Sequence, residues 1–499
     1  MKAFLMYKDM DFDINQKLPS NEQALIQDLE LNTLFDSMAE GDEFIFEVAK
    51  KTVLTGLNNG IETIKYRQNI LKDCLKNPAI IRGIYQIPIE LIENKRKYWH
   101  GFFRNEPSAI LYGAVQTMQA YVGFLKKLKN ISDVHADKFS SEGFKAFFSM
   151  IRKELDNEYF TTIQNQLKEL EFRKGVLISA DLGEGNEGRN YILRKPKDKN
   201  QGWIKQIFTQ KHPVYTFYIA DRDESGAKAL SELINRGVNL VANSLAQSAD
   251  HIESFFKMLQ TELAFYIGCL NLYEQLAQIG ESVSFPVPAD INKRRHSFKG
   301  LYDVCLALTK KQKIVSNNLN AESKEVFIIT GANQGGKTVF LRSIGLAQLM
   351  MQCGMFVAAE SFRANICNGI FTHYKRKEDA SMKSGKLDEE LSRMNEIVNN
   401  IKTNSMMLFN ESFAATNERE GSEIARQIIY ALMEKHIKIF FVTHLYEFAH
   451  NFYDKNTEIA IFLRAERKAD GRRTFKIIEG EPLETSHGED LYKSIFLNS

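Results

Sequence analysis

The sequence lacks the features that mark membrane, secreted and disulfide-rich proteins. No segment has the roughly 18 consecutive apolar residues that a membrane-spanning helix needs. The N-terminus shows no basic start, apolar run and small-residue cleavage site of a secretory signal. The 5 cysteines form no CxxC pair and no spacing typical of metal ligands. We therefore expect a cytoplasmic protein, with no membrane partner, whose cysteines are reduced and buried.

A strong charge of either sign is also missing. The chain has 65 lysine and arginine residues against 63 aspartate and glutamate residues, so its net charge gives no argument for nucleic-acid binding. We find no internal repeat and no low-complexity tract. The 499 residues have ordinary globular proportions of hydrophobic and charged residues, and they are too many for one core. We expect about three domains.

The first part of the chain is predicted to be helical. Over residues 1–174, apolar residues recur three and four positions apart, and glycine and proline are sparse. In residues 175–220, short runs rich in β-branched and aromatic residues, such as "GVLISADL" and "PVYTFYIAD", predict a small β-containing insertion. Helical periodicity returns in residues 221–288, as one very long helix or two shorter ones. It stops near Gly280, where glycine and proline break the pattern.

Residues 289–499 have a different rhythm. Apolar runs of strand length alternate with segments of helical periodicity, which is typical of a parallel sheet flanked by helices. The predicted fold class is therefore α+β and multidomain, with an all-helical region that carries a small β insertion and an α/β domain after it.

The stretch "GANQGGKT" fits the phosphate-binding pattern GxxxxGK[ST] in full. It follows the strand-like run "VFIIT" and precedes a helical segment, whose N-terminal N–H groups favour an anion. The glycines let backbone N–H groups point inward, the lysine meets the outer phosphates, and the threonine hydroxyl can hold Mg²⁺. The pattern predicts a P-loop nucleotide site. Its residues are Gly331, Ala332, Asn333, Gln334, Gly335, Gly336, Lys337 and Thr338.

A second strand-like run, "SMMLFNES", should supply the acidic half of such a site. Asn410 occupies the position where a metal-holding acid is expected, and Glu411 follows it. The asparagine oxygen can still face Mg²⁺, but it lacks the charge that strengthens carboxylate binding, so we expect weakened metal affinity. We predict that Glu411 is the general base. The open alternative is that both residues begin a surface turn.

A third run, "KIFFVTHL", ends at His444. A polar side chain at this strand end can contact the γ-phosphate or the attacking water and so report whether the nucleotide is intact. His444 is therefore a second predicted catalytic residue. A histidine that simply packs at the end of a strand is the other interpretation.

These motifs together resemble those of the MutS family of DNA mismatch repair ATPases. "IITGANQGGKTVFLRSIGLAQLMMQCGMFVAA" is similar to the family's Walker A region, "SMMLFNESFAATNEREGSEIA" to its Walker B strand, and "FFVTHLYEF" to its switch strand. The resemblance covers residues 290–485 well and the helical stretches less closely. It implies an ABC-type P-loop ATPase domain that uses ATP and Mg²⁺. It also implies a homodimer, paired through the ATPase domains, that acts as a nucleotide-switched clamp on double-stranded or branched DNA.

The resemblance also assigns the segments. It implies a core domain over 1–174, a clamp-like insertion over 175–220, lever and core-return helices over 221–288, and the ATPase domain over 289–499. The chain begins directly with core-like helices, so we expect the N-terminal mismatch-recognition domain to be missing. The insertion is short but basic, and it could contact DNA phosphates and stack on bases or could simply be solvated. The residues concerned are Arg194, Lys195, Lys197, Lys199, Trp203, Lys205 and Lys211.

One motif departs from the family. In "EDASMKSGKLDEELSRMNEI", Glu390 and Leu391 match the signature segment that completes the partner's site, but Gly385 and Lys386 replace its Ser-Thr pair, and Ser384 could supply the hydroxyl. An amphipathic helix with a solvated face is the alternative. Two functions therefore stay open: a slow, DNA-dependent ATPase clamp, and a nucleotide-binding scaffold with little hydrolysis and a protein partner.

Overall fold

The structure, a computed structural model, describes residues 1–98, 106–173, 175–195, 214–376, 385–468 and 472–482. The chain forms two compact units that interleave along the sequence. The first comprises residues 1–3, 82–139 and 145–260, and the second comprises residues 4–81, 140–144 and 261–499. Within the described ranges, no helix is both long and apolar enough to cross a membrane. The domain boundaries expected from the sequence stay a prediction.

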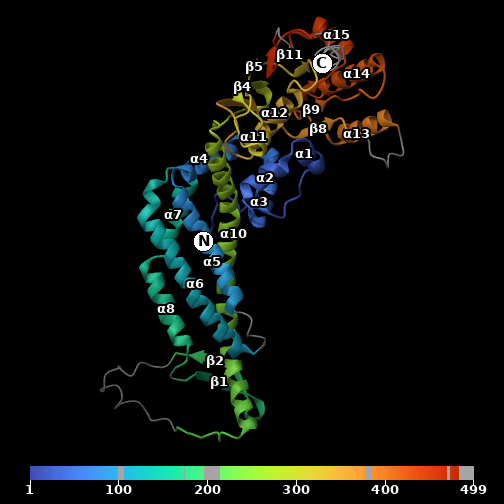
Figure 1. The fold of residues 1–499 in the computed structure, drawn as a ribbon. Coiled ribbons are helices and arrows are strands. Elements are labelled where there is room, and N and C mark those ends of the chain that lie inside the picture. Colours follow the sequence, from blue (N-terminus) through green and yellow to red (C-terminus); the bar gives the residue numbers. More distant parts are fainter. Residues whose placement is uncertain (99–105, 174, 196–213, 377–384, 469–471, 483–499) are drawn as a thin grey trace, which may run out of the picture. The chain divides into compact units, whose positions relative to one another are not determined.

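The first unit is built mainly from long helices (Figure 1). They are α5 (Pro78–Tyr98), α6 (Pro107–His135), α7 (Glu142–Glu154), α8 (Asn157–Leu170) and α10 (Glu224–Ile279), and the ends of α5, α7 and α10 belong to the second unit. Helix α10 is continuous over 56 residues. Of the two possibilities that the sequence left open for this region, the single long helix is therefore correct.

The expected β insertion is present in part. Strands β1 (Leu177–Leu182) and β2 (Gly188–Arg194) form an antiparallel hairpin. The run 214–220, which has the composition of a strand, is not one: it has no regular secondary structure and pairs with no strand in the described part of the chain. Tyr215, Phe217 and Tyr218 are exposed there. Strand propensity alone was misleading because a strand also needs a neighbour to satisfy its backbone groups.

The second unit begins with short helices whose apolar faces are buried. These are α1 (Glu22–Asp28), α2 (Leu31–Ala39), α3 (Glu43–Thr55) and α4 (Ile61–Lys76). Helix α3 starts where it does because the Asp42 side chain accepts hydrogen bonds from the amides of Phe44 and Ile45, at 2.8 and 3.2 Å. All five cysteines of the chain are free and buried, as predicted.

A six-stranded sheet forms the centre of the second unit. Its order is β12-β11-β6-β10-β9-β8, and all neighbours are parallel except β12 and β11. The strands are β6 (Val326–Thr330), β8 (Ile370–Tyr374), β9 (Met406–Asn410), β10 (Lys438–Val442), β11 (Ala460–Arg467) and β12 (Arg473–Glu479). The predicted parallel sheet is thus confirmed, with one antiparallel strand added at its edge.

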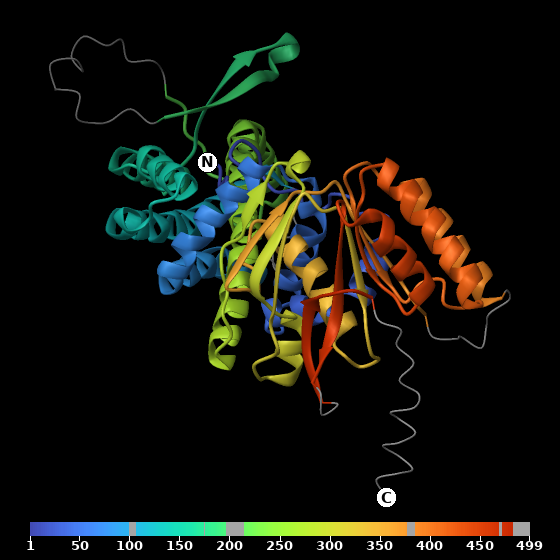
Figure 2. The same ribbon diagram turned by 90° about the horizontal axis from the view of Figure 1, so that it is seen from above.

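Helices cover both faces of this sheet (Figure 2). Helix α12 (Lys337–Gln352) packs on one face, while α13 (Lys386–Asn400), α14 (Glu418–Glu434) and α15 (Tyr446–Asn456) bury apolar side chains on the other. Strands β6 and β10 are buried along their whole length, which explains their unbroken apolar sequences. Because β6, β9 and β10 are parallel, the polar residues that follow them lie at the same edge of the sheet.

A second sheet was not predicted. It has four strands in the order β3-β7-β4-β5, formed by β3 (Val287–Ala289), β4 (Arg295–Leu301), β5 (Asn317–Glu322) and β7 (Ser361–Asn365). Helix α11 (Val304–Lys310) follows β4. The strands are short and come from distant parts of the sequence, so no local pattern announces their pairing.

Candidate functional site

The loop between β6 and α12 depends on its glycines. Gly331 and Gly336 have φ angles of +113° and +92°, in the left-handed region that only glycine adopts easily. Space is limiting as well, because a Cβ on Gly331 would lie 2.9 Å from the backbone nitrogen of Ala465. Gly336 is the N-cap of α12. The chain therefore turns tightly from the buried strand into the start of a helix, with its backbone exposed to a ligand.

Lys337 is held inside this loop. Its ammonium group donates to the carbonyl oxygens of Gly331 and Ala332, at 2.8 and 2.9 Å. The side chain is buried, and this burial lowers the pKa of Lys337 to about 8, although the nearby Glu411 carboxylate works in the opposite direction. Among the described residues, Glu411 supplies the carboxylate near this buried cation, so a further anion could be bound there. A phosphate group would supply that negative charge.

The two predicted metal-binding residues are in contact. Thr338 Oγ1 donates to Asn410 Oδ1 at 3.1 Å, across the gap between α12 and the end of β9. Two adjacent oxygen ligands of an octahedral Mg²⁺ lie about 3.0 Å apart, given the ion's bond lengths of about 2.1 Å. The pair therefore fits Mg²⁺, provided that phosphate oxygens and water supply the remaining ligands and the negative charge.

Glu411 and His444 also meet. The Glu411 carboxylate lies 3.0 Å from His444 Nε2, which in turn lies 3.4 Å from Lys337 Nζ. The hydrogen bond from His444 lowers the pKa of Glu411, burial opposes this, and the charges of His444 and Lys337 assist it. Glu411 is thus an ionised carboxylate at neutral pH, able to accept a proton.

The strand register explains why these residues converge. The amide of Glu411 donates to the Val442 carbonyl at 2.8 Å, and the amide of Thr443 donates to the Ile329 carbonyl at 3.0 Å. Both bonds continue the ladders between neighbouring parallel strands. The residues after β6, β9 and β10 are thereby aligned, which brings Lys337, Glu411 and His444 together.

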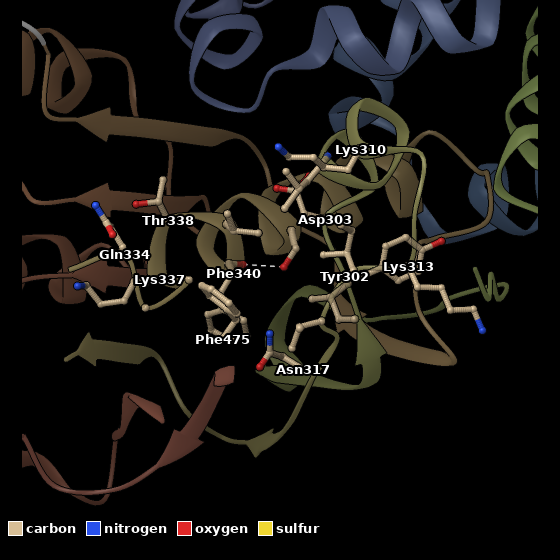
Figure 3. Close-up of a pocket in the computed structure, with 18 of the residues that line it drawn as sticks. Tyr302, Asp303, Lys310, Lys313, Asn317, Gln334, Lys337, Thr338, Phe340 and Phe475 are labelled. Carbon is tan, nitrogen blue, oxygen red and sulfur yellow. Dashed lines mark hydrogen bonds between the residues drawn. The ribbon is translucent and has the colours of Figure 1, made fainter. Parts of the chain in front are cut away.

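A cavity of about 440 Å³ adjoins the phosphate-type loop. Figure 3 shows Gln334, Lys337 and Thr338 at one end of it and Tyr302 and Lys313 at the other. Asn333, Gly335 and Gly336 also line it. Much of the remaining wall is apolar, contributed by Leu301, Tyr302, Leu306, Ile314, Val315, Val339, Phe340 and Phe475. Asp303, Lys310 and Lys313 line the cavity as well. A cavity with Lys337 beside the loop and a largely apolar wall beyond it suits a ligand with phosphates and a flat ring.

No sequence motif predicted this apolar wall. Phe475 lies on β12, where it is half-exposed and has a φ angle of +59°. Ile314 and Val315 precede β5, and Leu306 lies on α11. These residues are far from the phosphate loop in the sequence, and none belongs to a motif. Only the pairing of β12 with β11 and the fold of the second sheet bring them to the cavity.

The other predicted contacts come from the segment at the start of α13 and from the insertion. Gly385 and Lys386 lie at the start of α13, and Ser384 lies outside the described residues. In the insertion, Arg194 donates to Ser179 Oγ at 2.8 Å, and Lys195 pairs with Glu169 at 2.7 Å. The remaining candidates of the insertion, Lys197, Lys199, Trp203, Lys205 and Lys211, also lie outside the described residues.

Comparison with known protein families relates both halves of the chain to domains of the same family. Residues 59–279 match the family described as the MutS2 N-terminal domain, and residues 327–497 match MutS domain V. The chain belongs to the MutS family. The second match contains the loop with Lys337, together with Asn410, Glu411 and His444. The first match covers helices that resembled the family less closely in sequence.

Several curated proteins are similar to this MutS-family chain. It is 27% identical over 265 residues to the DNA mismatch repair protein MutS of Streptococcus mutans, which is 52% of this chain and 30% of that protein. It is 25% identical over 284 residues to MutS protein homolog 4 of Mus musculus, 55% of this chain and 29% of that protein. For MutS of Clostridium botulinum the identity is 34% over 153 residues, 30% and 16% of the two chains. The chain spans less than a third of the length of these relatives.

Proposed function

We propose that this MutS-family protein binds ATP with Mg²⁺ and hydrolyses it slowly. The observation that carries this proposal is that Lys337 and Glu411 line one cavity and that His444 contacts both of them. A buried ammonium group beside an ionised carboxylate supplies both a phosphate-binding cation and a proton acceptor. The MutS domain V match over residues 327–497 supports it, since that match contains all three residues.

In the proposed reaction, the nucleotide base lies against the apolar wall and the phosphates reach the loop. Backbone N–H groups at the start of α12 and the Lys337 ammonium hold the phosphate oxygens. Thr338 and Asn410 would hold Mg²⁺, and the ion would neutralise charge on the phosphates. Glu411 accepts a proton from the water that attacks the γ-phosphorus, and the bond to the β-phosphate oxygen breaks to release ADP and phosphate. His444 holds the Glu411 carboxylate in place and senses the terminal phosphate.

We further propose that the chain acts as a homodimer through its ATPase domains and closes as a nucleotide-switched clamp on double-stranded or branched DNA. The relatives from Streptococcus mutans and Clostridium botulinum are both named DNA mismatch repair protein MutS, which supports a DNA partner. The proposed domains are a core over 1–174, a clamp-like insertion over 175–220, lever helices over 221–288 and the ATPase domain over 289–499. The second candidate, a scaffold with little hydrolysis and a protein partner, is favoured by one observation, the uncharged Asn410 at the metal pair.

Steady-state hydrolysis of wild type and Glu411→Gln separates the two candidates. Glutamine keeps the size of the side chain but accepts a proton poorly, so turnover should fall roughly 10²–10⁴-fold. Affinity for a non-hydrolysable ATP analogue should stay within about twofold of wild type, because the loop is intact. Equal rates in the two proteins would support the scaffold. Duplex and branched DNA are then added at low salt, and DNA that neither binds nor changes turnover would remove nucleic acid from the proposal.

A further inference from the structure

The backbone around Ser412, directly after Glu411, has an unusual conformation. Glu411 and Phe413 have φ angles of +55° and +63°, in the left-handed region that is unfavourable for residues with a Cβ. This turn aims the Glu411 side chain at His444. Such a conformation persists only where surrounding contacts hold it, so the groups that hold this turn decide where the carboxylate lies.

The turn is held by buried side chains of two other elements. The amide of Phe413 donates to Glu390 Oε2 of α13 at 2.9 Å. Ser412 Oγ lies 2.7 Å from His373 Nδ1 of β8 and 2.6 Å from the His373 carbonyl oxygen. Glu390, His373 and Ser412 are all buried. Each of the two residues after Glu411 therefore has a hydrogen-bond partner outside its own loop.

His373 connects these partners to each other. Its Nε2 lies 3.0 Å from the Glu390 carbonyl oxygen, which can only accept, so Nε2 donates. Burial lowers the pKa of His373 to about 4, and the ring is therefore neutral, which leaves Nδ1 and the His373 carbonyl to share the Ser412 hydroxyl proton. The ring also stacks on Phe413, with centroids 5.3 Å apart. One side chain thus contacts both α13 and the turn.

A second residue of α13 fastens the helix to the same strand. Arg393, one turn after Glu390, donates from Nη1 to the Tyr374 carbonyl at 3.1 Å. The lysine after Tyr374 continues the ladder toward β9, because its amide donates to the Asn410 carbonyl at 3.0 Å. Helix α13, strand β8 and the end of β9 (Figure 1) are consequently linked by hydrogen bonds up to the residue before Glu411.

We propose that Glu390 and His373 are positioning residues that hold Glu411 in its left-handed conformation, so that catalysis by Glu411 depends on how α13 is seated. The inference rests on the proposed ATPase function. A buried carboxylate is unfavourable unless it is bound, and one oxygen of Glu390 has no hydrogen-bond partner among the described residues. The contact with the Phe413 amide gives a reason for placing a carboxylate there.

The test compares Glu390→Ala with Glu390→Gln. Glutamine keeps an oxygen for the Phe413 amide, whereas alanine removes it. In the alanine variant kcat should fall about tenfold or more, since small misplacements of a catalytic group have effects of this size. KM and the affinity for a non-hydrolysable ATP analogue should change less than about twofold, and glutamine should restore most of kcat. Unchanged kcat in the alanine variant, equal losses in both variants, or a loss confined to KM would each overturn the proposal.

A second measurement is independent of ATP chemistry. Hydrogen exchange at the Phe413 amide should be faster in Glu390→Ala than in wild type and in Glu390→Gln; equal exchange in all three would overturn the positioning role. If the wild type does not hydrolyse ATP, the proposed function alone is wrong. Hydrogen exchange at the Phe413 amide then still tests whether Glu390 holds the turn. If Glu390→Ala does not fold, His373→Phe keeps the ring stacked on Phe413 but removes both ring hydrogen bonds. It should show the same loss of kcat and faster exchange at this turn, and wild-type values would overturn the proposal.

Discussion

Two groups of ionisable side chains in the second unit are bonded in different ways. At the cavity, Lys337, Glu411 and His444 lie against one another, and the last two are each 28% exposed. Near the N-terminus, Glu262 of α10 is fully buried and accepts from the amides of Leu5 and Phe12, at 2.6 and 3.1 Å. In the first group, Lys337 and Glu411 face a cavity where they can bind a ligand. In the second, each carboxylate oxygen of Glu262 already accepts a hydrogen bond from a backbone amide. The difference distinguishes a candidate ligand site from an anchor, although both groups consist of ionisable side chains.

The N-terminal anchor includes a second side chain. Arg67 of α4 donates from Nε to the Met6 carbonyl at 2.9 Å and from Nη1 to the Cys353 carbonyl at 3.2 Å. Leu5, Met6 and Phe12 are buried between these polar contacts. Residues 4–12 have no helix or strand of their own, so side chains of distant helices satisfy their backbone groups. Changes at the anchor should alter stability, and changes at the cavity should alter binding.

The largest effect that tests this contrast is expected for Lys337→Ala. The change removes the cation inside the phosphate-type loop, and ATP affinity should fall more than about 100-fold, because a charge-assisted contact to phosphate is lost in a partly desolvated site. The free energy of unfolding should not fall, since burial of this ammonium group is unfavourable. Titration calorimetry and thermal unfolding measure the two quantities. Retained ATP affinity would contradict the assignment of the site.

At the anchor, Glu262→Gln should change stability in a way that depends on pH. Burial raises the pKa of Glu262 to about 7, so the folded protein binds a proton that the unfolded chain releases above its ordinary value of 4.5. The free energy of unfolding of wild type should therefore fall relative to the glutamine variant as pH rises from about 4.5 to about 7, by up to a few kcal/mol.

Denaturant titrations of both proteins at several pH values measure this difference. Glutamine is the matched control because it resembles the protonated carboxyl group at every pH. ATP affinity should be unchanged in the variant at pH 7.5. A stability difference that stays constant across the pH range would contradict the raised pKa of Glu262. A glutamine variant that binds ATP less tightly would show that the anchor and the site are not separate.

The smallest effect is expected for Asn410→Asp. A carboxylate beside Thr338 adds the charge that the amide lacks, so the Mg²⁺ concentration needed for half-maximal ATP binding should fall several-fold. The Asn410 oxygen that accepts from Thr338 at 3.1 Å is kept in aspartate, where it shares the negative charge of the carboxylate. Thr338→Val, which removes the other oxygen, should move the requirement in the opposite direction. Equal Mg²⁺ requirements in all three proteins would place the metal elsewhere.

The phosphate-type loop, the strands before it and the strand ends at Asn410 and His444 could be predicted because each is a local pattern. Buried parallel strands read as unbroken apolar runs, and the residues that follow them share one edge. The contacts of Glu390 and His373 with the turn after Glu411 could not be predicted. They join β8, β9 and α13, and the partners are separated by 17 to 39 residues. No sequence period relates such positions.

The amino-acid sequence by itself determined the helical region, the parallel strands and the identity of the residues at the phosphate end of the cavity. Periodicity and short motifs carry that information, since neighbouring residues share one element. Only the tertiary structure decided which apolar residues form the other end of the cavity, that residues 214–220 form no strand, and that Glu262 anchors the N-terminal segment. These outcomes depend on pairing between distant segments, where burial and available hydrogen-bond partners outweigh local propensity.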